Sequence, residues 1–186
     1  MVRHLKAKQQ AMQKAMQMEI IVSTPCRAWL TDLPDAVAIG ERVVGAALSD
    51  AVPARTLVEV GVSLMDDAAV RRLNRDYRQQ DKATNVLSFV GDDIDGPRHD
   101  GPLLLGDIVL AHGVLRAEAQ AQGKSLHDHF CHLLVHGTLH LLGHDHMNEG
   151  DAAAMEAQEI SILAGIGIAD PYLLSAEHST PPAIAD

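Results

Sequence analysis

Aromatic residues and cysteines are scarce in this chain of 186 residues. Aromatic side chains make up 3% of the sequence although 47% of the residues are hydrophobic, so we expect a core of Leu, Val, Ile, Ala and Met. Cys26 and Cys131 are the only cysteines, too few for a disulfide framework and typical of idle thiols in a reducing cytosol. The composition therefore predicts one globular domain in the cytoplasm.

Long hydrophobic runs are also missing. No apolar stretch approaches the ~18 residues that a membrane-spanning helix requires. The N-terminal residues lack the apolar segment and the cleavage site of a secretory signal. Both patterns predict a cytoplasmic protein without membrane partners.

Positive charge is in short supply, because the net charge is −10. Residues 1–17 carry four basic residues and no acid, so the rest of the chain is more acidic than the total indicates. This balance argues against a protein that coats nucleic acid through its overall charge. Any polyanionic partner must meet a local basic patch. We interpret residues 1–17 as an extension, either a loose helix or a disordered arm, and Met18 as an alternative start.

Hydrophobic periodicity predicts four strands and five helices. Alternation predicts the strands, which fall at 19–23, 56–65, 85–90 and 103–110. Helical spacing predicts the helices, which fall at 35–50, 66–78, 111–122, 126–142 and about 151–164. No internal repeat or interdomain linker interrupts them. We therefore predict a single α+β domain over residues 18–165 and a largely disordered tail over residues 166–186.

Histidines gather in one predicted helix and just beyond it. His132 and His136, and again His136 and His140, lie one helical turn apart, so either pair can reach a single ion. Gly143 can end the helix in a left-handed conformation and turn the chain back, which would bring His146 to the same ion. The resulting H-x-x-x-H-x-x-G-x-x-H spacing is that of the metzincin motif. It predicts a three-histidine site with an open fourth position, the catalytic type when the metal is zinc.

The residues around this motif bear on its chemistry. We expect His129 and His132 on the helix surface and His144 in the wall of the site. Asp145 is either an acceptor for an imidazole N–H or a solvated turn residue. Three imidazoles also accept nickel, copper or iron, so the spacing does not fix the metal. Metalloproteases of this spacing place a glutamate directly after the first histidine, where this chain has Gly137, so a peptidase is disfavoured.

A second group of residues predicts phosphate binding. Basic side chains recur near helical spacing, and we call them the cationic stripe: Arg71, Arg75, Arg78 and Lys82. If the helix continues through them, they form a candidate RNA-binding surface beside a buried face that contains Leu73 and Tyr77. The equally weighted alternative is a solvated face on which Asp76 is an ion-pair partner.

Three blocks of the sequence resemble the YbeY family of bacterial endoribonucleases, which mature ribosomal RNA. HGTLHLLGHDH (136–146) is similar to that family's signature H-G-x-L-H-L-x-G-Y-D-H. LNRDYRQQDKATNVLSF (73–89) and LLGDIVL (104–110) resemble its second and third blocks. The resemblance covers about Met18 to Gly165. One departure is His144, which stands where the family usually has tyrosine and so alters the wall of the site.

The resemblance implies a fold, a site and a function. The fold is compact α+β, with a small mixed four-stranded sheet, about five helices and one zinc ion in a cleft. The implied zinc ligands are His136, His140 and His146, on and after a helix of the C-terminal half, and Arg78 is the implied cleft arginine. The implied function is cleavage of single-stranded RNA, in 3′-end maturation of small-subunit 16S rRNA and late ribosome quality control. The implied partners are the small ribosomal subunit, its proteins and an assembly GTPase.

Our leading hypothesis is metal-dependent RNA hydrolysis. Zinc would activate a water or polarise a phosphoryl oxygen, while Arg78 would hold the phosphate. Either that water or the RNA 2′-hydroxyl can be the nucleophile, and His144 and Asp145 are candidate bases. The alternative is a non-catalytic assembly factor with a structural zinc, and a peptidase with a base from elsewhere is the third hypothesis. The few cations of the stripe predict weak RNA binding that depends on a ribosomal context.

Overall fold

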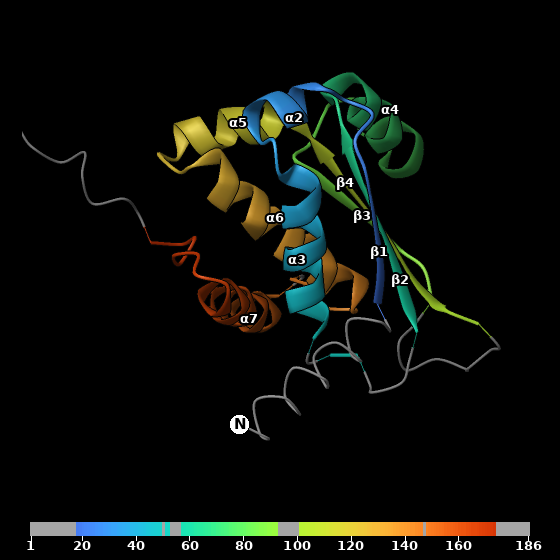
Figure 1. Ribbon diagram of the computed structural model, residues 1–186, viewed down its shortest axis with the longest axis vertical. Coiled ribbons are helices and arrows are strands. Elements are labelled where there is room, and N and C mark those ends of the chain that lie inside the picture. Colours follow the sequence, from blue (N-terminus) through green and yellow to red (C-terminus); the bar gives the residue numbers. More distant parts are fainter. Residues whose placement is uncertain (1–17, 50, 53–56, 93–100, 147, 174–186) are drawn as a thin grey trace, which may run out of the picture.

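The computed structural model describes residues 18–49, 51–52, 57–92, 101–146 and 148–173. The predicted N-terminal extension and the tail beyond residue 173 lie outside these ranges. Within them, four strands and six helices form one α+β domain, as predicted (Figure 1). No helix in the described part of the chain has both the length and the apolar character that a bilayer span needs.

A mixed four-stranded sheet forms the centre of the domain. Its strands are β1 (Met18–Ser23), β2 (Val58–Met65), β3 (Val86–Val90) and β4 (Leu103–Ala111). Their order is β1-β2-β4-β3, in which β1, β2 and β4 run parallel and β3 runs antiparallel to β4. Strand β3 is therefore an edge strand. The alternation of buried and less buried residues along β2 is the pattern that predicted this strand from the sequence.

Six helices surround the sheet in the described residues. They are α2 (Ala28–Asp32), α3 (Ala36–Leu48), α4 (Asp67–Arg78), α5 (His112–Ala121), α6 (Leu126–Leu141) and α7 (Glu149–Gly165). Five of them coincide with predicted helices, whereas α2 is too short to show a helical period. On one face of the sheet, α3 packs over β1 and α6 over β3 and β4, and α7 lies against α6 (Figure 1).

The main core lies between that face of the sheet and helices α3 and α6. Its strand residues are Val58, Val60, Val62 and Leu64 of β2 and Leu103, Leu105, Ile108 and Leu110 of β4. Trp29 and Phe130 are its aromatic members, so the core is aliphatic as the composition predicted. A smaller cluster on the opposite face joins Val70 of α4 to Leu87 and Val109. Helices α4 and α6 therefore lie on opposite faces of the sheet.

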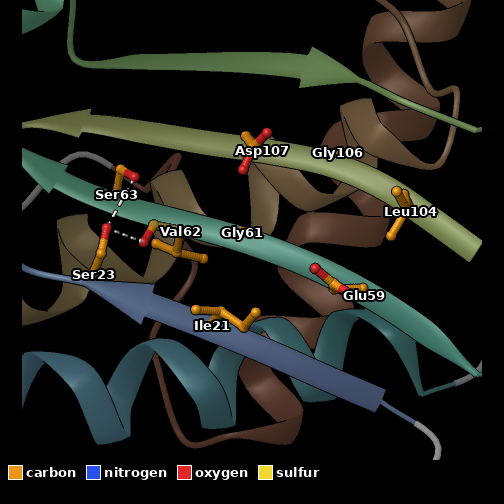
Figure 2. Close-up of a pocket in the computed structure, with 9 residues that line it drawn as sticks. All are labelled: Ile21, Ser23, Glu59, Gly61, Val62, Ser63, Leu104, Gly106 and Asp107. Atoms are coloured by element: carbon orange, nitrogen blue, oxygen red, sulfur yellow. Dashed lines mark hydrogen bonds between the residues drawn. The ribbon is translucent and has the colours of Figure 1, made fainter. Parts of the chain in front are cut away.

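The rest of the opposite face carries a shallow depression (Figure 2). It is lined by Ile21, Ser23, Glu59, Gly61, Val62, Ser63, Leu104, Gly106 and Asp107. Its ionisable side chains, Glu59 and Asp107, are both acidic. Because like charges repel, this part of the molecule disfavours a phosphate ligand.

The folded domain continues past the predicted boundary at residue 165. Ile168 belongs to the main core and is 9% exposed. The Tyr172 hydroxyl donates a hydrogen bond to the Glu159 carboxylate. The chain therefore contacts the domain beyond residue 165 through Ile168 and Tyr172, within the range predicted as a largely disordered tail.

Candidate metal centre

The end of α6 turns the chain back toward its own helix. Gly143 adopts a φ of 86°, the left-handed conformation predicted for it. The Gly143 N–H donates to the His140 carbonyl and the His144 N–H to the Leu139 carbonyl, each at 3.0 Å. These two bonds form a Schellman motif, which caps the last carbonyls of the helix and reverses the chain. The reversal places His146 beside the last turns of α6.

Three histidines meet at this turn, as the sequence predicted. One ring nitrogen from each of His136, His140 and His146 lies within 4.8 Å of the others. The Nε2 atoms of His136 and His140 are 3.1 Å apart. Around a tetrahedral zinc ion with bonds of 2.0–2.1 Å, neighbouring nitrogens would be ~3.4 Å apart, so small adjustments suffice. His146 is exposed and the other two are partly buried, so the group is open to solvent.

The hydrogen-bond partners of two rings determine which nitrogens face the centre. His136 Nδ1 lies 2.8 Å from Glu159 Oε1, and His140 Nδ1 lies 3.0 Å from the His144 carbonyl oxygen. A carboxylate and a carbonyl can only accept, so both Nδ1 atoms must donate. In neutral rings both Nε2 atoms then carry lone pairs, which face each other at 3.1 Å. A cation between them relieves this repulsion, so the donor set fits a metal ion.

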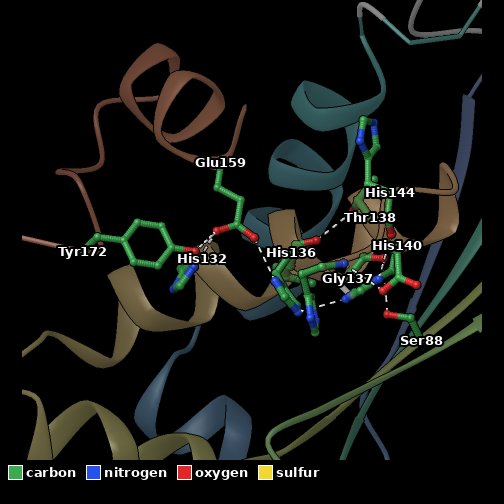
Figure 3. A network of polar contacts seen from close by, with 12 residues as sticks. Ser88, His132, His136, Gly137, Thr138, His140, His144, Glu159 and Tyr172 are labelled. Atoms are coloured by element: carbon green, nitrogen blue, oxygen red, sulfur yellow. Dashed lines mark hydrogen bonds and ion pairs between the residues drawn. The ribbon is translucent and has the colours of Figure 1, made fainter. Parts of the chain in front are cut away.

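Glu159 of α7 is the residue that the sequence analysis missed (Figure 3). Its side chain is 1% exposed and accepts from His136 Nδ1, from His132 Nε2 at 3.0 Å and from the Tyr172 hydroxyl. Burial opposes ionisation, but these hydrogen bonds outweigh it and lower the pKa of Glu159 to about 2. The carboxylate is therefore charged at neutral pH and orients the His136 ring.

The centre also favours the form of histidine that binds metals. Burial and the neighbouring His136 lower the pKa of His140 below its ordinary value. His140 is therefore neutral at pH 7, and a neutral imidazole is the ligand that zinc and other late first-row metals accept. The arrangement can hold one metal ion with part of its coordination sphere facing solvent.

Comparison with known proteins identifies the family. The model of the family described as endoribonuclease YbeY matches residues 34–167. The chain belongs to the YbeY family. The endoribonuclease YbeY of Paramagnetospirillum magneticum is 53% identical over 83% of this chain and 95% of its own length. The endoribonuclease YbeY of Sphingopyxis alaskensis is 51% identical over 77% of this chain and 88% of its own length. A solution structure of a protein from Thermotoga maritima is 20% identical, with a TM-score of 0.46. The match covers 80% of this chain and 91% of that protein.

The cationic stripe that the sequence predicted is interrupted. Gln79 adopts a φ of 59° and ends α4, so Lys82 does not continue the helix. The loop folds back, because Asn74 Nδ2 donates to the Lys82 carbonyl at 2.8 Å. Arg71 and Arg75 are paired with Asp81 at 2.7 Å and Asp76 at 2.9 Å respectively. The predicted alternative, with Asp76 as an ion-pair partner, thus describes part of this face.

Arg78 and Tyr77 end α4 on the face of the sheet opposite to α6. Arg78 is exposed and has no hydrogen bond or ion pair within the described part of the chain, the three histidines included. Tyr77 was expected to be buried with Leu73, but it is 70% exposed. Its ring meets Phe89 of β3 edge-on, with centroids 5.2 Å apart. The last turn of α4 reaches the edge strand, which leaves most of the Tyr77 ring uncovered.

His129 and His132 of α6 were predicted to lie on the helix surface, and this prediction is wrong. His129 is 3% exposed, and its Nε2 lies 2.9 Å from Glu118 Oε2. His132 bonds to Glu159 and packs edge-on against the Tyr172 ring. The reason is that the sheet, α3, α5 and α7 all pack on α6, which leaves it little free surface.

In the described part of the chain, the side chains of His144 and Asp145 make no hydrogen bond to an imidazole of the centre. His144 contacts the centre through its backbone carbonyl, while its side chain lines a separate depression with Leu139 and Ile162. Asp145 is exposed, and its carboxylate accepts the His146 backbone N–H at 2.8 Å. This matches the predicted alternative of a solvated turn residue.

Gly137, at the position of the protease glutamate, faces the sheet. A Cβ atom there would lie 2.9 Å from Ile108 Cγ2 and 3.2 Å from Ser88 Oγ. A glutamate at this position would point into packed side chains, away from the ion. We expect Gly137→Glu to destabilise the fold by at least ~2–3 kcal/mol, through overpacking and an unpaired buried carboxylate.

Chemical denaturation would measure this loss, and a peptidase assay would accompany it. Gly165→Glu is a matched control, because no atom lies within 4 Å of a Cβ at Gly165. Full stability of Gly137→Glu, or peptide cleavage by it, would contradict the packing argument.

Proposed function

We propose that this chain is a zinc-dependent endoribonuclease that cuts single-stranded RNA at the His136, His140 and His146 centre. The observation that carries the proposal is the convergence of three histidine nitrogens at a solvent-facing point. The relatives of this chain are named endoribonucleases. Three protein ligands are typical of catalytic zinc sites, whereas structural zinc usually has four. The ligand set therefore supports an enzyme over a factor with a structural zinc.

The protein residues have distinct roles in this proposal. The bound metal would supply Lewis-acid chemistry at the scissile phosphate. Glu159 and the His144 carbonyl hold the rings of His136 and His140 with Nε2 toward the centre. Arg78 binds an RNA phosphate, because its guanidinium is exposed and free of protein partners within the described residues. Either water or the RNA 2′-hydroxyl attacks the phosphorus.

The same proposal extends to the biological substrate. We infer that the RNA is ribosomal, with the 3′ end of small-subunit 16S rRNA as the processed site. The partners would be the small subunit, its proteins and an assembly GTPase, in the cytoplasm. The support is the acidic net charge of −10, which makes unaided RNA binding weak and favours presentation of the RNA by a ribosomal particle.

An RNA cleavage assay tests the activity. Purified protein of known metal content would be incubated with an rRNA fragment that carries a 3′ extension. We expect Arg78→Ala to lower kcat/KM by about 10–100-fold, because a charged hydrogen bond to an RNA phosphate is lost. Arg42→Ala on α3, also an exposed arginine, should change it little.

The outcomes separate the proposed functions. Cleavage that stops on chelation and returns with zinc supports the enzyme, and a 2′,3′-cyclic phosphate product would assign attack to the 2′-hydroxyl. A metal-loaded protein that binds the fragment without cutting it would instead favour an assembly factor. Equal cleavage by Arg78→Ala would remove the arginine from the site.

A further inference from the structure

The placement of the aromatic residues is unusual. The chain has one Trp, two Tyr and two Phe. Trp29 and Phe130 are fully buried in the core, and Tyr172 binds Glu159. Tyr77 and Phe89 instead pair at the surface, and Tyr77 is 70% exposed. The interplanar angle of 72° means that the two rings meet edge to face rather than in a parallel stack, and the high exposure of Tyr77 leaves much of its ring surface open to solvent.

Two basic residues lie near the same end of α4 as Tyr77. Arg78 directly follows Tyr77, and Lys82 lies in the loop that folds back along α4. Neither side chain has a hydrogen bond or ion pair to the residues that the structure describes. In a chain of net charge −10, an exposed aromatic ring near two cations that have no partner among the described residues is a local exception. Proteins that bind single-stranded nucleic acid combine these two features, since bases stack on aromatic rings while cations meet the phosphates.

The edge strand β3 connects this surface to the metal centre. Ser88 Oγ donates to the Gly137 carbonyl of α6 at 3.2 Å, and the next residue, Phe89, meets Tyr77. Successive residues of a strand point to opposite faces. Helix α6 and Tyr77 therefore flank the same point of β3, one on each face of the sheet.

The histidines point toward the same edge. Gly137 faces the sheet, and Leu139 lines a depression together with residues of α3 and α7. Successive residues of a helix are rotated by 100° about its axis. His136 and His140 therefore project from the side of α6 that faces neither the sheet nor this depression. Helix α3 lies over β1, at the other edge of the sheet, so this side opens toward β3.

We propose that Tyr77 stacks on an unpaired base of an RNA strand that crosses the β3 edge to the metal centre, with Arg78 and Lys82 at the adjoining phosphates. This inference rests on the proposed function and assigns a nucleobase subsite to it. The subsite selects for single strands, because a base within a duplex has both faces covered by its neighbours. It selects little among the four bases, since every base offers a flat face.

Binding of a short labelled single-stranded RNA, read by anisotropy at low temperature before cleavage, tests the subsite. The proteins are wild type, Tyr77→Ala, Tyr77→Phe and Leu173→Ala. Leu173 serves as the control, because it is as exposed as Tyr77, at 70%, but lies beyond α7. We expect Tyr77→Ala to weaken binding about 5- to 100-fold and to raise KM more than it lowers kcat. Tyr77→Phe and Leu173→Ala should bind like wild type.

Two further arms separate stacking from charge and from folding. On the same sequence annealed to its complement, wild type and Tyr77→Ala should bind equally. In the second arm, one nucleotide at a time is made abasic. At one position the missing base should weaken binding by wild type, while binding by Tyr77→Ala should not weaken further. Unchanged single-strand binding by Tyr77→Ala, or an equal loss on the duplex, would overturn the stacking site.

The proposed activity fails in a different way. Wild type that binds the single strand through Tyr77 without cutting it refutes the nuclease and leaves the subsite intact. Wild type that does not bind the single strand overturns the subsite, whereas the nuclease is judged by the cleavage assay on the rRNA fragment.

Discussion

Replacing His140 by alanine should abolish tight metal binding and RNA cleavage together. His140 supplies one of three converging nitrogens, and its Nε2 lies 3.1 Å from that of His136. Loss of an outer partner of a ligand lowers metal affinity by 10–100-fold, so loss of a ligand itself should cost more than about 100-fold. Zinc affinity by competition with a chelating dye, and cleavage of the rRNA fragment, would measure the two effects.

The matched control for this variant is His127→Ala. His127 lies in the first turn of the same helix, and its Nδ1 is 2.9 Å from Asp128 rather than in the cluster. It should keep wild-type metal content and cleavage. If His140→Ala retained one metal per chain with wild-type affinity, the three-histidine centre would be refuted. If it lost the metal but still cut RNA, the cleavage would come from a contaminant or from another site.

Replacing Glu159 by glutamine should weaken metal binding by about 10–100-fold without removing a ligand. The carboxylate accepts three hydrogen bonds, two of them from histidines. A glutamine has one acceptor oxygen, and its N–H₂ group would face donors. The mismatch releases the His136 ring, and each donor left unpaired in the interior costs about 1–3 kcal/mol of folding free energy.

A positioning role predicts more than lower stability. Excess metal should restore much of the cleavage by Glu159→Gln, and nitrogen NMR should show a changed tautomer of His136. Glu156→Gln removes the same charge from the exposed side of α7 and should have neither effect. Wild-type metal affinity and an unchanged His136 tautomer in Glu159→Gln would show that the carboxylate only stabilises the fold.

The regular elements were predictable because they depend on local patterns. Alternation along 58–65 and helical spacing along 36–48 each reflect one buried face, and such a pattern is visible in the sequence itself. The three histidines were predictable for the same reason, since i and i+4 on a helix and a glycine at its end are local geometry. The predicted sheet, helices and family all agree with the structure and the comparisons.

The rest depended on tertiary packing. Glu159 lies 23 residues after His136, and nothing local distinguishes it from the exposed Glu156. The exposure of Tyr77 depends on where β3 lies in the sheet, because helical spacing alone placed it on a buried face with Leu73, which is partly buried. The burial of His129 likewise reflects the number of elements that surround α6.

The same histidine spacing can therefore serve different chemistry. In the protease motif the residue after the first histidine must reach the metal-bound region, whereas here Gly137 meets Ile108 and Ser88. Packing of α6 on the sheet leaves no room for a base at that position. The sequence indicated this through one missing glutamate, and the structure gives the steric reason.

The hydrogen bond from Tyr172 to Glu159 also bears on the order of synthesis. The strands and all three histidines precede residue 147, but the carboxylate that orients His136 and the hydroxyl that holds this carboxylate come later. A chain emerging from the N-terminus folds its early segments first. The candidate metal centre therefore lacks part of its hydrogen-bond network until residue 172 has emerged from the ribosome that makes the chain.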